Sequence, residues 1–68
     1  DLMGLAVQTE SGEAIGRITQ ILSGEQIDIW VAKRDGEEVM FPAVREVVLS
    51  VDLHAGIAIA DSFEELEA

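Results

Sequence analysis

The side chains that could carry out acid–base or nucleophilic chemistry are few and lie far apart in the sequence. There is one histidine, His54, which stands two residues after Asp52 in a predicted turn. General acid–base catalysis needs a base held against an orienting neighbour, and a nucleophilic serine needs a sharp turn between a strand and a helix. No serine of this chain has that context, and the chain has no cysteine. The sequence therefore predicts a protein without catalytic residues, and it gives no indication of an oxidising compartment.

A second group of reactive side chains is the acidic cluster Asp35, Glu37 and Glu38. Carboxylates bind hard cations, but the spacing of a twelve-residue calcium loop is missing, and there is no pair of His or Cys ligands. The glycines do not form a phosphate-binding or dinucleotide-binding motif. We therefore expect a solvated charged turn, with no metal and no cofactor. An acid-rich barrel that binds a metal remains an alternative.

The charge of the chain is strongly negative, with 14 acids, 4 bases and a formal net charge of −10 over 68 residues. Surfaces that follow a phosphate backbone are built from many Lys and Arg residues, so general nucleic-acid binding is disfavoured. A basic protein is the natural electrostatic complement. Because Lys33 and Arg34 lie close to Trp30 in the sequence, a small local contact with RNA is the alternative.

Short apolar runs separated by turn residues define the elements that must position these groups. The runs span residues 4–8, 14–22, 26–33, 38–41, 46–52 and 57–60. Asp35-Gly36 is a strong hairpin signal between the third and fourth runs, and Pro42 is expected to close the fourth. Six short strands without a long helix predict an all-β fold, a small six-stranded antiparallel barrel. We expect the barrel to be closed, because so short a chain could hardly cover the edges of an open sheet.

Alternation within the third and fifth runs predicts which side chains share a face. The residues expected to share a face are Ile27, Ile29 and Val31 in the third run, and Val47, Leu49 and Val51 in the fifth. Trp30 does not lie on the face shared by Ile27, Ile29 and Val31. It either fills the thin core of a small domain or, if it lies outside beside Lys33, anchors an interface.

The last residues differ in character from the strands. Ser62 and Glu65 have the spacing of a capping box, so residues 62–68 are expected to form a short helix or to fray as an acidic tail. Phe63 and Leu66 could then cover one end of the barrel. We expect residues 1–61 to form one domain, and the start at Asp1 suggests a domain cut from a longer chain.

Four segments, in their order and spacing, resemble a known family. They are DLMGLAV, SGEAIGRITQIL, SGEQIDIWVAKRDGEEVMFPAV and VVLSVDLHAGIAIAD. Together they resemble the PRC-barrel domain of the bacterial ribosome maturation factor RimM, over residues 1–61. The family usually carries an aromatic, often double-tyrosine, segment before the position of Asp1, and Trp30 stands where an aliphatic residue is more usual.

The resemblance implies a non-catalytic assembly factor with an N-terminal barrel domain before this one, a domain that is absent from this chain. It implies action in the cytoplasm on the head of the 30S subunit, assistance to 16S rRNA processing, and association with small-subunit ribosomal protein number nineteen. Little direct nucleic-acid binding is expected of this domain, and no membrane. The alternative is a stand-alone PRC barrel that acts as a structural or self-associating module.

On this reading the candidate protein-binding residues are exposed acids of the predicted hairpin, the connector that follows it, and one aromatic side chain. They are Trp30, Asp35, Glu37, Glu38, Pro42, Ala43, Val44 and Arg45.

Overall fold

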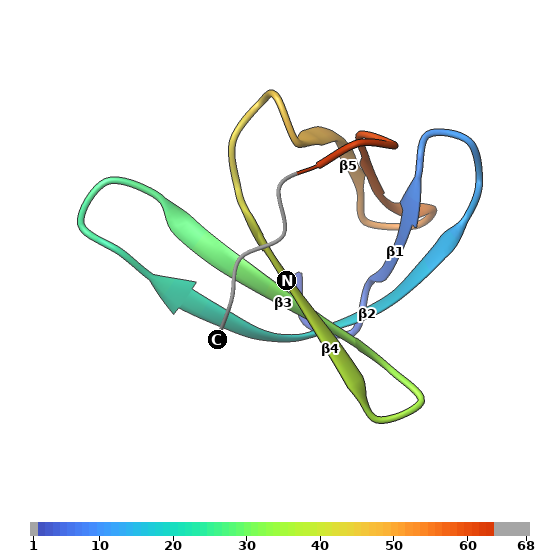
Figure 1. Ribbon diagram of the computed structural model, residues 1–68, viewed down its shortest axis with the longest axis horizontal. Helices are drawn as coiled ribbons and strands as arrows, with labels where there is room; N and C mark the ends of the chain where they lie inside the picture. Colours follow the sequence, from blue (N-terminus) through green and yellow to red (C-terminus); the bar gives the residue numbers. More distant parts are fainter. Residues whose placement is uncertain (1, 64–68) are drawn as a thin grey trace.

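Turn residues divide the chain into six strands, close to the predicted positions. The computed structural model describes residues 2–63 (Figure 1). The strands are β1 (Ala6–Thr9), β2 (Ala14–Ser23), β3 (Asp28–Arg34), β4 (Glu37–Pro42), β5 (Val48–Asp52) and β6 (Gly56–Ile59). They form one sheet in the order β4-β3-β2-β1-β6-β5. The all-β, six-stranded prediction is confirmed.

The hairpin between β3 and β4 forms where the Asp-Gly pair predicts it. Asp35 and Gly36 both have positive φ, 51° and 85°, as the two central residues of a type I′ turn require. The two strands then pair without a bulge, from Arg34 opposite Glu37 to Ile29 opposite Pro42. β4 also ends at Pro42, as predicted.

Two details of the predicted barrel are wrong. β1 and β6 run parallel, with Val7 opposite Ile57 and Thr9 opposite Ile59, so the sheet is mixed and not purely antiparallel. Within residues 2–63, β4 and β5 stand at the two ends of the strand order and do not pair, so the hydrogen-bonded sheet stays open. The amides of Val47 and Val48 both donate to the Val44 carbonyl, and this tight turn leads the chain from β4 across to the other end of the sheet.

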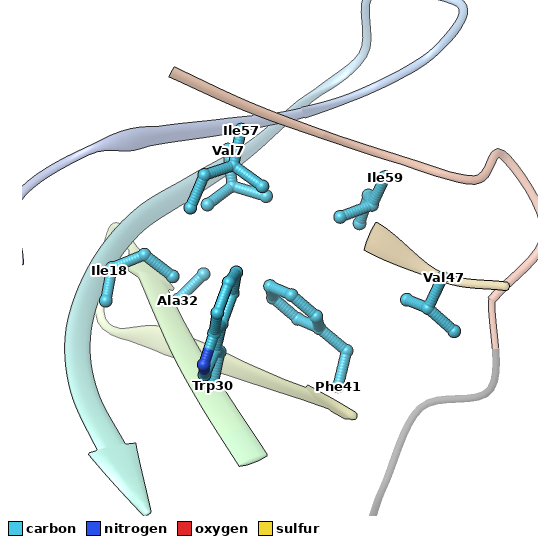
Figure 2. Close-up of a cluster of buried hydrophobic side chains, with 8 residues drawn as sticks. All are labelled: Val7, Ile18, Trp30, Ala32, Phe41, Val47, Ile57 and Ile59. Carbon is cyan, nitrogen blue, oxygen red and sulfur yellow. The ribbon is translucent and has the colours of Figure 1, made fainter. Parts of the chain in front are cut away.

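The sheet curls around a core to which β1, β2, β3, β4 and β6 each contribute, together with the residue before β5 (Figure 2). The core cluster is Val7, Ile18, Trp30, Ala32, Phe41, Val47, Ile57 and Ile59. Phe41 lies at its centre, because its ring meets Trp30 edge-on at a centroid distance of 6.2 Å and Phe63 at 6.1 Å. Of the two roles predicted for Trp30, the core role is confirmed.

The structure shows which face of β3 points inward. Trp30 and Ala32 belong to the core cluster, whereas Ile27 is 42% exposed. Val31 is also buried, but outside that cluster. Strict alternation defines two faces without saying which one is inside. Here the face that carries the large indole is the one that packs against Phe41.

The prediction that Val47 shares a face with Leu49 and Val51 is wrong. Val47 is buried and Val48 packs against the core, but Leu49 and Val51 are 47% and 45% exposed. The pairing with β6 shifts between Val48 and Ser50. A bulge of this kind inserts an extra residue and changes which side chains face inward.

The C-terminal prediction is tested only at its start. Ser62 and Phe63 are not helical, and Phe63 packs against the core as expected. The rest of the predicted helix or tail, including Leu66, lies outside the described residues. In the described part of the chain, no helix has the length and apolar character needed to cross a membrane.

Candidate protein-binding surface

The acidic residues of the predicted site form the exposed tip of the β3–β4 hairpin. Asp35, Glu37 and Glu38 are all exposed. The only ion pair within residues 2–63 joins Arg34 Nε to Asp35 Oδ2 at 3.7 Å, and both side chains are largely in solvent. Exposed pairs of this kind stabilise a fold little. The tip is therefore an accessible acidic surface, which we call the acidic tip.

The connector Pro42–Arg45 lies at the opposite end of β4. Its Ala43 amide donates to the Asp28 carbonyl at 2.9 Å, which holds it against the start of β3. Ala43 and Val44 are half-buried against the core, and Arg45 is exposed. β4 separates the connector from the acidic tip by roughly 17 Å, at about 3.3 Å per residue. The structure therefore does not bring these two predicted parts together.

Trp30, the third part of the predicted site, is removed from solvent. Its side chain is 9% exposed, and its Nε1 has no hydrogen-bond partner among the described residues. Because it is buried, the indole lies beneath the surface that a partner protein would contact. Direct contact by Trp30 stays a prediction, and its position in the core does not support it.

An apolar surface that the sequence reasoning missed lies on and just after β5. Leu49, Val51 and Leu53 are 47%, 45% and 61% exposed, and β5 has no strand on its outer side within residues 2–63. The signal was present, because these residues alternate with Ser50 and Asp52. Alternation alone does not say whether the shared face is exposed. We call this set the β5 apolar surface; exposed apolar side chains on an open edge are common at docking sites.

Asp52 and His54 belong to a turn and do not form an acid–base pair. Asp52 Oδ1 accepts hydrogen bonds from the main-chain amides of His54 (2.7 Å) and Ala55 (3.0 Å). These bonds, above all the one from Ala55, lower the pKa of Asp52 below its usual value. Asp61 has a lowered pKa for a similar reason, since its carboxylate accepts from Ser11. The Asp52 carboxylate thus holds a turn together, and the Asp61 carboxylate joins the turn after β1 to the chain after β6.

The lowered pKa of Asp52 predicts a small loss of stability in acid. A carboxyl group whose folded pKa is depressed stabilises the fold above its unfolded pKa, here about 3.8, and that contribution is lost as the pH falls through the lower folded value. We expect Asp52→Asn to melt a few degrees below the wild type near neutral pH and to approach it in acid. Melting curves recorded from about pH 6 to about pH 2.5 would test this.

The control for this experiment is Glu25→Gln, which also removes an exposed carboxylate but touches no hydrogen bond of the described residues. A parallel offset between Asp52→Asn and the wild type at every pH would contradict the assignment.

No cluster of three metal-ligating side chains occurs in residues 2–63.

Comparison with known proteins gives the family. The model of the RimM PRC barrel domain matches residues 1–66. The ribosome maturation factor RimM of Caldanaerobacter subterraneus subsp. tengcongensis is 38% identical over 66 residues, which make up 97% of this chain and 39% of that protein. RimM of Geobacter metallireducens is 42% identical over 67 residues, 97% of this chain and 38% of its own.

A solved structure agrees with the sequence matches. The crystal structure of the 16S ribosomal RNA processing protein RimM from Pseudomonas aeruginosa superimposes with a TM-score of 0.80 at 30% identity, over 90% of this chain and 41% of the other. The chain thus spans about two fifths of the length of these relatives. On its sequence, its strand arrangement and these matches, the chain belongs to the RimM PRC-barrel family.

Proposed function

We propose that this domain is a non-catalytic docking module of a ribosome maturation factor. It binds a basic protein of the small-subunit head, for which small-subunit ribosomal protein number nineteen is the candidate, and so assists 30S assembly and 16S rRNA processing in the cytoplasm. The names of the relatives support a role in ribosome maturation. The observation that carries the choice of a basic partner is the exposed acidic tip on a chain of net charge −10.

The mechanism is equilibrium binding in two parts. The acidic tip increases the rate of encounter with a positively charged partner, because complementary potentials steer diffusion. The β5 apolar surface supplies the apolar contact that slows dissociation. The excess of acids also repels bare RNA at long range, which discourages binding away from the partner.

Calorimetric titration against the isolated head protein tests the proposal. The experiment uses this chain and, in parallel, the longer factor expected to contain it. A saturable complex that weakens as salt is added would support the proposal. The absence of a saturable complex with either protein would overturn it.

The acidic tip should act on the association rate. We expect Glu37→Gln/Glu38→Gln to slow association roughly threefold to tenfold at low salt and to leave dissociation nearly unchanged. The difference should shrink at physiological salt, where the screening length is about 8 Å. Stopped-flow or surface-based kinetics at several salt concentrations would measure it.

The matched control is Glu25→Gln/Asp28→Asn, which changes the net charge equally through two exposed acids at the opposite end of β3 from the tip. Equal slowing in both variants would show that only the overall charge matters. In that case the acidic tip would not be the steering surface.

A second candidate function is self-association, which the open edge of β5 favours. An unpaired edge strand with exposed apolar side chains can pair with another copy. Sedimentation over a wide concentration range distinguishes the two, because a monomer at all concentrations would exclude obligate self-association. A stable dimer would support it.

A further inference from the structure

Three of the four bases of this acidic chain line one hollow of about 320 Å³. Arg17 comes from β2, and Lys33 and Arg34 come from the end of β3. The rest of the lining comes from β1 and the start of β2, including Gly16. We call this feature the basic hollow. With 14 acids available, the gathering of positive charge at one place needs an explanation.

The pairing of β2 with β3 makes this gathering unfavourable in the absence of a ligand. Arg17 and Lys33 stand directly opposite each other. Like charges in that position destabilise a sheet. Lys33 also faces Glu38, and Arg34 faces Glu37, across to β4. Neither of these cross-strand pairs is close enough to form an ion pair, and within residues 2–63 the Lys33 ammonium has no hydrogen-bond or ionic partner.

The backbone holds the two guanidinium groups in place. Arg17 Nη1 donates to the Gly4 carbonyl and Arg34 Nη1 to the Ala14 carbonyl, each at 3.0 Å. A guanidinium has five N–H donors, so each keeps further donors for another acceptor. Arg34 also lies near Asp35, but that contact is long at 3.7 Å and exposed. Arg17 is thus tethered without an ionic partner among residues 2–63, and Arg34 has only this long, exposed one.

Gly16 shapes the hollow. Its φ is +149°, and a Cβ atom there would lie 2.7 Å from the Lys33 carbonyl oxygen. Only glycine allows β2 to approach β3 so closely at this point. The close approach brings the backbone positions of Arg17 and Lys33 together beside the hollow.

We propose that the basic hollow binds one phosphate group, from an RNA backbone or from free phosphate. Two guanidinium groups and one ammonium suit the several oxygens of a phosphate, and Arg gives directional bonds to them. A single carboxylate would need only one arginine. The site goes beyond the proposed protein docking, because it adds a local anion contact to a surface that repels RNA at a distance.

The test uses two probes, inorganic phosphate and a mixed-sequence RNA pentanucleotide, with amide chemical shifts recorded by NMR. Both probes should perturb residues of the basic hollow. Lys33→Gln should weaken binding of the pentanucleotide roughly tenfold, as expected for loss of a charge-assisted bond. Its affinity should fall with salt with a logarithmic slope of about −0.7, since one phosphate of a single strand is neutralised.

Two control variants make the result specific. Gln26→Glu changes the net charge as much as Lys33→Gln does, but at the exposed β2–β3 turn at the other end of β3. It should bind the pentanucleotide within about twofold of the wild type, because salt screens a distant charge. Lys33→Arg keeps the charge and should bind like the wild type.

The outcomes separate the two sources of phosphate. Binding of both probes at the hollow supports an RNA phosphate, and binding of inorganic phosphate alone supports a free phosphate ligand. Perturbations elsewhere, equal weakening by Gln26→Glu, or no binding of either probe would overturn the proposal. Tighter binding of a glutamate-rich peptide than of the pentanucleotide would also overturn it. These results are independent of the titration with the head protein, which tests the docking function.

Discussion

Replacing Phe41 with Ala should leave much of the domain unfolded at 25 °C. The Phe41 side chain is fully buried, and its ring contacts Trp30 and Phe63 edge-on. Truncating a buried Phe to Ala costs about 3–5 kcal/mol, because apolar burial is lost and a cavity remains. At about 0.05–0.15 kcal/mol per residue, a chain of this length has a total stability of only ~3–10 kcal/mol. The loss is therefore comparable with the whole stability.

Urea unfolding followed by far-ultraviolet circular dichroism measures the effect of Phe41→Ala. The control is Leu53→Ala, which also shortens an apolar side chain but at a position 61% exposed. Its cost should be below about 0.5 kcal/mol. Similar urea midpoints for the two variants would show that Phe41 is not at the centre of the core. Phe41→Leu should fall between them.

Replacing Gly56 with Ala should have the second largest effect. Gly56 has a φ of +110°, and a Cβ atom there would lie 2.5 Å from the Ala6 carbonyl oxygen. The added Cβ at position 56 and the Ala6 carbonyl oxygen both lie where β6 pairs with β1. The clash can therefore be relieved only if these two parallel strands move apart. Strain of this kind at a main-chain position costs about 2–4 kcal/mol. We expect a lower melting temperature and loss of amide-exchange protection in β6.

Gly36→Ala is the matched control for the Gly56 variant. Gly36 also has a positive φ, +85°, but a Cβ atom there would meet nothing within 4 Å. Only the conformational cost remains, about 1–2 kcal/mol. If the two variants lost the same stability, the approach of β6 to Ala6 would be unimportant. If β6 amides stayed protected in Gly56→Ala, the parallel pair would not depend on the glycine.

Local sequence signals predicted the strands and one hairpin correctly, because those features depend on neighbouring residues. Asp35-Gly36 specifies its turn through backbone conformation alone. The pairing of β1 with β6 joins residues about fifty positions apart, such as Val7 and Ile57. No short-range pattern encodes that contact, and so the parallel pair was not predicted.

The candidate sites were predictable to a smaller extent, since a site depends on which residues the fold brings together. The acidic tip was recognisable from its composition. Its separation from the connector followed only from the length of β4. The basic hollow depends on the register that sets Arg17 against Lys33, and the β5 apolar surface depends on a bulge between Val48 and Ser50. Both are properties of strand pairing.

The buried Trp30 gives this protein a built-in optical probe. Trp30 is the only tryptophan, and the chain has no tyrosine. Light at the long-wavelength edge of the near-ultraviolet absorption band therefore excites a single indole. The indole lies in the core against Phe41, with its Nε1 unbonded among the described residues. We therefore expect it to emit as an indole in an apolar environment and to shift to longer wavelength when water enters the core. The intrinsic fluorescence of this domain reports on the integrity of its interior without any label.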